Sequence, residues 1–266
     1  MSATISNERA ELMPVIKKLG VQIQKKDYQL DIKPLLKLVL TKFFGDVSCL
    51  VDGMVQNFKN SADGTKAKVS NYYRNATDNK EIADQLMKCD AKGPLCINII
   101  KLIYNESNSN FYSFGRIISG TVRRGDTVKV LGEGYTVEEE EDMIVKTIGK
   151  LWIMQGRYKI DVDMMTAGNW IMIEGIDQSI SKTATVVSTN FEGVDIFKPL
   201  EFHIESVIKV ACEPLNPSDL PKMLEGLRKI NKSYPLARTK VEESGEHIIY
   251  GTGELYMDSI LNDLRT

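Results

Sequence analysis

The sequence is poor in the residues that build metal sites, disulfide frameworks and membrane spans. Its 266 residues include four cysteines and two histidines, and no two cysteines have the CxxC spacing of a zinc site. The cysteines are irregularly spaced, which argues against a disulfide framework and favours a reducing cytosolic or nuclear setting. Neither a run of about 18 apolar residues nor a basic segment leading into an apolar one is present. The sequence therefore predicts no membrane span and no export signal.

An excess of charge of either sign is also missing, because the formal net charge is −2. A protein that binds nucleic acid through a general positive field is expected to be strongly basic. Any contact with nucleic acid must then come from a local patch. The length fits two domains or three short ones.

The motifs of a nucleotide site are absent as well. The sequence has neither the phosphate-binding GxxxxGK[ST] loop nor the guanine-binding NKxD motif, and Asn231-Lys232-Ser233-Tyr234 is not a variant of the latter. Asp90 to Gly93 matches DxxG, but that pattern is common by chance and lies in a polar stretch. We predict that this chain has no catalytic, metal or cofactor site and neither binds nor hydrolyses GTP.

The first sixty residues have the apolar periodicity of helices. From about Asp31 apolar residues recur along one helical face, Gly45 is placed to end the helix, and a second apolar set continues the pattern. The two sets are Leu35, Leu36, Val39, Leu40 and Phe43, then Val47, Leu50, Val51, Met54 and Phe58. Residues 1–60 are predicted to be a helical segment in which these two helices form an antiparallel pair. Residues 61–92 are polar and are predicted to be a linker with one helical turn near residues 82–87.

Residues 93–199 contain repeated short β runs separated by glycine. Such runs without intervening helices predict a closed β-barrel. The predicted strands are Leu95–Ile103, Phe111–Ser119, Thr127–Leu131, Ile144–Trp152 and Trp170–Ile176.

The period changes after residue 200. A strand over Ile204–Cys212 is followed by a helix whose apolar stripe begins at Leu220, then by two strands and a second helix. The order β-α-β-β-α supplies five of the six elements of a ferredoxin-like domain. The sequence stops at Thr266, before the sixth. We therefore expect the first strand to keep a bare edge, and the chain to be a piece of a longer protein.

The most informative stretch is KVEESGEHIIYGTGELYMD, residues 240–258. It predicts a strand end, a three-residue turn, a return strand from His247 to Tyr250, and two close glycines that start a helix. The three glycines are expected to adopt backbone angles that other residues resist, and the last glutamate to meet the positive end of the helix dipole. These signature residues are Glu242, Glu243, Ser244, Gly245, Glu246, His247, Gly251, Gly253 and Glu254.

This stretch closely resembles the signature of the third domain of elongation-factor-2-like translational GTPases. FGRIISGTVRRGD (residues 114–126) and LPKMLEGLRKINKS (220–233) match the family too, so the resemblance runs from about Gly93 to Arg265. Three details favour the spliceosomal branch, the GTPase subunits of the U5 snRNP, over the ribosomal factors. They are residues 132–153 with their acidic run 138–142, Ser233-Tyr234-Pro235, and residues 30–56, which resemble the end of that branch's GTP-binding region.

The resemblance implies a translation-factor-type β-barrel (domain II) over residues 93–199 and an incomplete ferredoxin-like α+β domain (domain III) over 200–266. It implies a non-catalytic middle fragment that acts in pre-mRNA splicing in the nucleus and couples an absent G domain to U5 partners. Those partners are the large U5 scaffold protein, through it the spliceosomal RNA helicase, and U5 snRNA through the full-length parent, which would hold GTP and Mg²⁺. A fragment of ribosomal elongation factor 2 and a free-standing RNA-binding barrel are the alternatives.

Six cations are candidates for contacts with a partner or RNA, against the alternative that they are merely solvated surface charges. Arg123, Arg124 and Lys129 lie in a predicted barrel hairpin. The other three lie near the end of a helix, where cations also favour the dipole. They are Arg228, Lys229 and Lys232.

Overall fold

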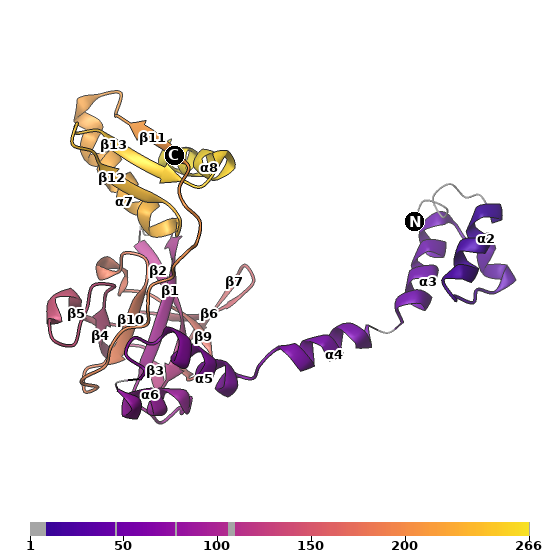
Figure 1. Ribbon diagram of the computed structural model, residues 1–266, viewed down its shortest axis with the longest axis horizontal. Coiled ribbons are helices and arrows are strands. Elements are labelled where there is room, and N and C mark those ends of the chain that lie inside the picture. Colours follow the sequence, from indigo (N-terminus) through magenta and orange to yellow (C-terminus); the bar gives the residue numbers. More distant parts are fainter. Residues whose placement is uncertain (1–8, 46, 78, 106–109, 266) are drawn as a thin grey trace. The chain divides into compact units, whose positions relative to one another are not determined.

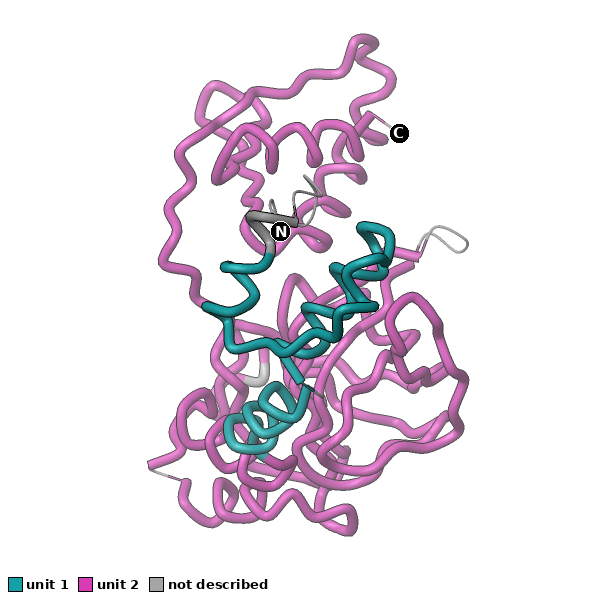
Figure 2. Tube along the Cα trace, turned by 90° about the vertical axis from the view of Figure 1, so that its right-hand side faces the viewer, with its two compact units in different colours: residues 1–59 teal, residues 60–266 magenta. Residues whose placement is uncertain are grey.

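The computed structural model describes residues 9–45, 47–77, 79–105 and 110–265. The chain divides into two compact units, residues 1–59 and 60–266 (Figure 2). The first unit is helical, as predicted. Its elements are α2 (Arg9–Lys18), the 3-10 helix η1 (Lys25–Gln29), α3 (Ile32–Phe44) and α4 (Ser48–Asn57).

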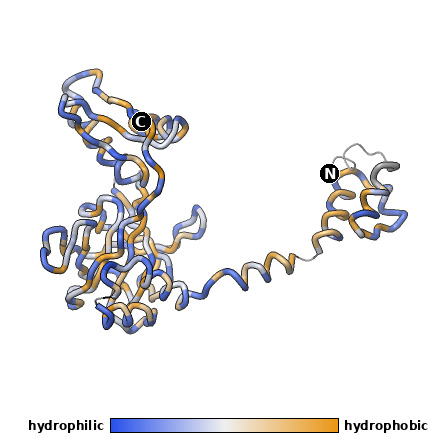
Figure 3. Tube along the Cα trace, in the orientation of Figure 1, coloured by the Kyte–Doolittle hydropathy of each residue, from blue (hydrophilic) through white to orange (hydrophobic). Residues whose placement is uncertain are grey.

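The predicted antiparallel pairing of α3 with α4 is wrong. The small core of this unit consists of Ile16, Val21, Leu35 and Val39, so α3 packs with α2, whereas α4 has no buried residue. Gly45 ends α3 with φ 70° and ψ −145°, and the chain leads away from α3 instead of reversing along it (Figure 1). The apolar residues of α4 therefore stay at the surface, where they give it the orange turns of Figure 3.

Residues 61–92 are not a linker, which corrects the sequence prediction. They form α5 (Ser61–Tyr72) and α6 (Lys80–Met87). Val69, Tyr73 and Leu86 are fully or almost fully buried in a core that they share with strand residues. The sequence of this stretch is typical of a linker because its apolar residues are few, yet Val69, Tyr73, Ala83 and Leu86 are buried in that core.

A polar network around the buried residues Tyr73 and Asp195 fixes these helices to the strands. The Tyr73 hydroxyl accepts a hydrogen bond from the Asp195 amide at 2.9 Å, and the Asn75 side chain donates to the Asp195 carboxylate at 2.8 Å. Arg74 pairs with the same carboxylate at 3.7 Å and donates to the carbonyl of Tyr135 at 2.8 Å. Because the polar groups satisfy one another, their burial is compatible with a stable core.

The main sheet has eight antiparallel strands in the order β5-β4-β10-β1-β2-β9-β6-β7. Its members are β1 (Cys96–Asn105), β2 (Asn110–Ser119), β4 (Thr127–Leu131), β5 (Met143–Thr147), β6 (Leu151–Gln155), β7 (Tyr158–Val162), β9 (Trp170–Ile173) and β10 (Ala184–Ser188). The short strands β3 (Thr121–Arg123) and β8 (Met164–Thr166) form a separate pair. Two 3-10 turns follow β4 and β9, η2 (Glu140–Asp142) and η3 (Asp177–Ser179).

The predicted strand over residues 144–152 is two strands, β5 and β6. Gly149 lies at the break, and its amide donates to the carbonyl of Glu174 at 2.9 Å. A Cβ on Gly149 would lie 3.1 Å from that carbonyl oxygen. The close approach of another segment therefore ends one strand before the next begins.

The eight-stranded sheet curves around one apolar core. Val130 on β4 and Leu151 on β6 belong to the same buried cluster, although several strands separate them in the sheet. Within the described residues the hydrogen-bond ladders end at β5 and β7, so the closure expected of a barrel rests on the shared core and not on a continuous ladder.

Residues 208–265, called here the C-terminal domain, contain a second sheet. Its elements are β11 (Ile208–Cys212), the 3-10 turn η4 (Pro217–Asp219), α7 (Leu220–Ser233), β12 (Arg238–Val241), β13 (His247–Gly251) and α8 (Glu254–Arg265). The strands pair antiparallel in the order β11-β13-β12, and both helices share a core with one sheet face. The order of elements agrees with the sequence prediction. The first strand begins at Ile208 instead of Ile204, and residues 199–207 connect the two sheets as a largely exposed segment.

Candidate functional site

The signature hairpin forms between β12 and β13. Its turn is closed by the Gly245 amide, which donates to the carbonyl of Glu242 at 2.9 Å, and by the Glu242 amide, which donates to that of Glu246 at 3.0 Å. The Ser244 hydroxyl donates to the Glu246 carboxylate at 3.2 Å, whereas Glu243 is exposed. All of these bonds lie within the hairpin itself.

The three signature glycines differ in what their backbones require. Gly245 has a φ of 89°, as predicted. Gly251 and Gly253 do not have a positive φ. The prediction that they adopt backbone angles that other residues resist is therefore wrong. A Cβ on Gly251 would lie 2.7 Å from the Met257 methyl group, so this glycine makes room for the helix that follows.

His247 and Glu254 mark the two ends of the signature's last part. His247 opens β13 opposite Cys212 and is half-buried. Glu254 is exposed in the first turn of α8, where a carboxylate favours the dipole. The hairpin belongs to the same domain as α7, which carries three of the six candidate cations, whereas the other three lie in β3, β4 and the turn between them.

Four of the candidate cations lie away from the contact between the two sheets. Arg123 and Arg124 are exposed at the turn after β3, where the Arg123 amide donates to the Asp126 carboxylate at 2.7 Å. Lys129 is half-buried on β4, and Arg228 is exposed on α7.

The remaining two candidates join the C-terminal domain to the eight-stranded sheet. The Lys232 ammonium donates to the carbonyl of Asp177 at 2.9 Å and lies 5.8 Å from the centre of the Phe111 ring. Partial burial lowers the pKa of Lys232. Lys229 pairs with Glu225 at 3.0 Å and lies 5.6 Å from the centre of the Tyr104 ring on β1.

Sequence reasoning missed Lys182, which makes the reciprocal contact. Its ammonium donates to the carbonyl of Pro235 at 2.9 Å and to that of Tyr234 at 3.5 Å, and also to the carbonyl of Ala237. These carbonyls follow the C-terminal end of α7, where the helix dipole favours a cation. Burial lowers the pKa of Lys182, which nearby Glu133 partly offsets. No local pattern distinguishes this lysine from an ordinary loop lysine.

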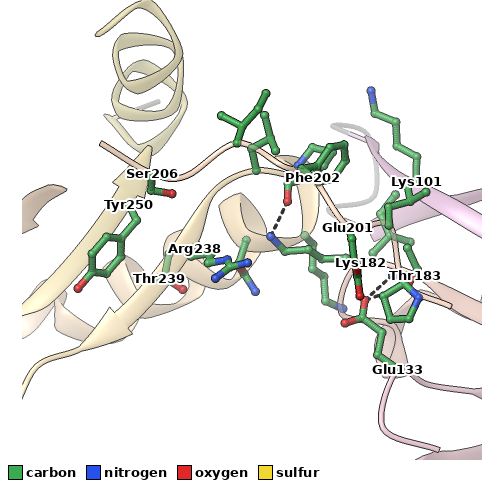
Figure 4. A pocket seen from close by; sticks show the side chains of 18 of the residues that line it. Lys101, Glu133, Lys182, Thr183, Glu201, Phe202, Ser206, Arg238, Thr239 and Tyr250 are labelled. Carbon is green, nitrogen blue, oxygen red and sulfur yellow. Dashed lines mark hydrogen bonds between the residues drawn. The ribbon is translucent and has the colours of Figure 1, made fainter. Parts of the chain in front are cut away.

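We call this pair of contacts the lysine exchange: Lys182 reaches from the first sheet to the end of α7, and Lys232 reaches from α7 to η3. A cavity of about 1030 Å³ opens beside it (Figure 4). Lys101, Glu133 and Thr183 lie on one side of the cavity, and Arg238, Thr239 and Tyr250 come from the C-terminal domain. The Glu133 carboxylate accepts from the amide and hydroxyl of Thr183, at 2.9 and 3.1 Å.

The residues of the DxxG match are held by hydrogen bonds within the fold. The Asp90 carboxylate of the DxxG match accepts from the Lys92 amide at 2.9 Å, and the Asp90 carbonyl accepts from the Gly120 amide at 2.8 Å. A Cβ on Gly93 would lie 2.6 Å from the Ser119 hydroxyl, so the motif builds a tight turn before β1. In the described part of the chain, no group of three or more His, Cys, Asp or Glu could hold a metal ion. None of the described helices is both long and apolar enough to cross a membrane.

Comparison with known proteins places the chain in a family. Residues 110–187, which run from β2 into β10, match the family Elongation factor Tu domain 2. The 110 kDa U5 small nuclear ribonucleoprotein component CLO and the 109 kDa component GFL of Arabidopsis thaliana are each 47% identical to the chain over 265 residues. The pre-mRNA-splicing factor cwf10 of Schizosaccharomyces pombe is 45% identical over 267 residues.

Each of these alignments covers 99% of this chain and 27% of the relative, so the chain spans about a quarter of the length of the curated relatives it matches. The identity extends over both units and the second sheet, well beyond the domain-2 match. The chain therefore belongs to the elongation-factor-2-like family of translational GTPases, among relatives that are components of the U5 small nuclear ribonucleoprotein.

Proposed function

We propose that this chain is the non-catalytic middle part of a spliceosomal elongation-factor-2-like GTPase that acts in pre-mRNA splicing in the nucleus. In this proposal residues 1–60 belong to the end of the GTP-binding region. The eight-stranded sheet is domain II, and residues 200–266 are a ferredoxin-like domain III without its last strand. GTP and Mg²⁺ bind to a part of the parent protein outside this chain. The relatives, which are U5 and splicing components, support this assignment.

The lysine exchange is the observation that carries the proposed coupling role. A hydrogen bond to a charged group contributes about 1.5–3 kcal/mol at most, and half-exposed lysines contribute less. These hydrogen bonds between the two sheets then contribute only a few kcal/mol. A ligand that binds one of two conformations more tightly than the other can supply a free energy of that size. A change in the G domain could therefore shift the C-terminal domain as a rigid body.

We propose that the partners bind to the full-length parent protein, of which this chain is a part. The large U5 scaffold protein would read the position of the C-terminal domain and pass it to the spliceosomal RNA helicase, and U5 snRNA would bind to the full-length parent. The signature residues Glu242 to Glu254 are proposed to serve this communication between domains. Arg123, Arg124, Lys129 and Arg228, which lie outside the lysine exchange, stay candidates for partner contacts.

The coupling is tested in the full-length protein with dyes on the eight-stranded sheet and on the C-terminal domain. Exchange of GTP for GDP should change energy transfer between the dyes in the wild type. Lys182→Ala combined with Lys232→Ala should abolish that change while GTP affinity stays within about twofold, since neither lysine meets nucleotide. Arg123→Ala combined with Arg124→Ala is the matched control and should behave like wild type. A change that persists in the lysine double variant would contradict the coupling role.

The non-catalytic assignment is tested on this chain alone. Titration with a fluorescent GTP analogue in the presence of Mg²⁺ should give no saturable signal, because the phosphate loop is absent and the DxxG match forms a turn. Micromolar or tighter binding would refute the assignment.

A further inference from the structure

The second sheet presents a basic face with an aromatic residue at its centre. In the ladder register, Tyr250 on β13 lies between Lys209 on β11 and Arg238 on β12. Lys240 follows two residues after Arg238 on the same strand. Side chains alternate between the faces of a strand, so these four share one face. The opposite face carries Val210 and Ile249, which pack with the helices.

This face also forms one wall of the cavity beside the lysine exchange. Arg238, Lys240 and Tyr250 line the cavity from the second sheet, and Lys101 lines it from β1. Lys101, Lys209, Arg238 and Lys240 are exposed. The Tyr250 hydroxyl donates to the Glu242 carboxylate at 2.7 Å, which fixes the orientation of the ring. Figure 4 shows Tyr250 at one end of the lining and Lys101 at the other, with Arg238 and Lys182 between them.

We propose that this groove, between the basic face of the second sheet and Lys101, binds single-stranded RNA. Exposed cations in a groove match the phosphates of a polyanion, and an oriented aromatic ring on a sheet offers a surface on which a base can stack. An acidic peptide would use the cations but would gain nothing specific from the ring. The overall charge of −2 makes this a local site and not a general field. The inference is independent of the coupling role, which requires the lysine exchange and no RNA.

Three carboxylates at the same cavity oppose RNA, and one of them, Glu133, is held by Thr183. Glu201 and Glu205 lie on the exposed connection between the sheets and line the cavity. Because like charges repel a phosphate backbone, Glu201→Gln combined with Glu205→Gln should tighten RNA binding. An unfolded variant would bind RNA more weakly. A gain in RNA affinity therefore distinguishes binding in the groove from a general loss of folding.

The experiment measures the fluorescence anisotropy of a labelled dodecamer of mixed single-stranded RNA with this chain at several salt concentrations. Arg238→Glu combined with Lys240→Glu should weaken binding at least tenfold. If both cations contact phosphates, the double variant should lower the slope of log K against log salt by about 1.4. Arg123→Glu combined with Arg124→Glu makes the same charge change outside the groove and should stay within about threefold of wild type.

The aromatic contact is tested separately. Tyr250→Phe keeps the ring and loses the bond to Glu242 that orients it, so its RNA affinity should stay within about threefold of wild type. Tyr250→Ala should weaken binding about 5- to 150-fold, the range for loss of one base-aromatic stack. Circular dichroism melts identify any variant that is unfolded.

Three results would overturn the proposal. One is an absence of binding in 50 mM salt, and another is an equal loss in the two charge-reversal doubles. The third is competition by a dodecamer of glutamate as strong as that by unlabelled RNA, which would assign the groove to an acidic protein segment. None of these results bears on the nucleotide-linked movement that is tested with the dyes. Each proposal can therefore be refuted without refuting the other.

Discussion

Among single residues, Gly245 and Gly253 belong to one signature, but only Gly245 has a positive φ. Gly245 has a φ of 89°, whereas a Cβ on Gly253 would meet nothing within 4 Å. We predict that Gly245→Ala destabilises the hairpin by about 1–2 kcal/mol, because an L-residue is strained in the left-handed region. Gly253→Ala should change it by less than about 0.5 kcal/mol. Hydrogen exchange of the β13 amides measures both, and equal protection in the two variants would contradict the prediction.

Tyr234 gives the C-terminal domain a dependence on alkaline pH. Burial and the hydrogen bond that its hydroxyl donates to Asp263 raise the pKa of Tyr234 to about 12. Because the folded state favours the protonated phenol, this stabilisation is complete below the ordinary pKa of about 10 and is lost as the pH rises toward 12. Stability should therefore fall over that window.

Ultraviolet difference titration of wild type against Tyr234→Phe measures this ionisation. Asp263→Asn should move the ionisation of Tyr234 toward lower pH, since the carboxylate charge is gone. A transition that stays near the ordinary pKa in the wild type would show that the hydroxyl is not held by Asp263.

Residues could be predicted from the sequence where the cause is local. Gly245 follows a serine between two strand patterns, which is a turn signal in itself. Lys182 could not be found, because its acceptors lie 52 to 55 residues further along the chain and are backbone carbonyls, which leave no trace in residue type. Lys232 is a candidate contact residue from the sequence, but its acceptors could not be predicted, because they lie on η3, 54 and 55 residues before it.

At the scale of elements, α6 tests whether the stretch before β1 is part of the folded core. Leu86 is fully buried. Leu86→Ala should lower the free energy of unfolding by about 2–5 kcal/mol, through lost burial and the cavity left behind. The matched control is Leu255→Ala on α8, because Leu255 is 85% exposed and should lose little. Urea denaturation followed by tryptophan fluorescence compares the two, and an unchanged Leu86→Ala midpoint would mean that α6 is dispensable.

Elements could be predicted where apolar residues dominate. The strands that became β1, β2, β4 and β9 are rich in β-branched and aromatic residues, and the stripe of α7 is regular. By contrast, α5 has a mostly polar sequence and only two buried residues, Thr65 and Val69. Its place depends on a tertiary network through Asp195, which no local window contains. The break between β5 and β6 likewise depends on the distant carbonyl of Glu174.

For the whole molecule, the free thiols can report unfolding of the eight-stranded sheet. Cys96 on β1 is fully buried, and burial raises its pKa to about 12. Cys49 on α4 is exposed. A thiol reagent at pH 8 should label Cys49 at once and Cys96 only as the sheet unfolds, because the thiolate is the reactive form. Mass spectrometry of timed samples distinguishes them, with Cys49→Ser removing the fast phase. Fast labelling of Cys96 in the native chain would contradict its burial.

The lysine exchange has a consequence for how the protein tolerates sequence change. Its acceptors are main-chain oxygens of Pro235, Ala237 and Asp177, and every amino acid carries such an oxygen. Substitutions at the receiving positions that preserve the backbone should therefore leave this contact intact, while truncation of either lysine removes its hydrogen bonds. A contact of this kind can persist while the residue types at the accepting positions change. A search for compensating pairs of charged residues across the two sheets would overlook it.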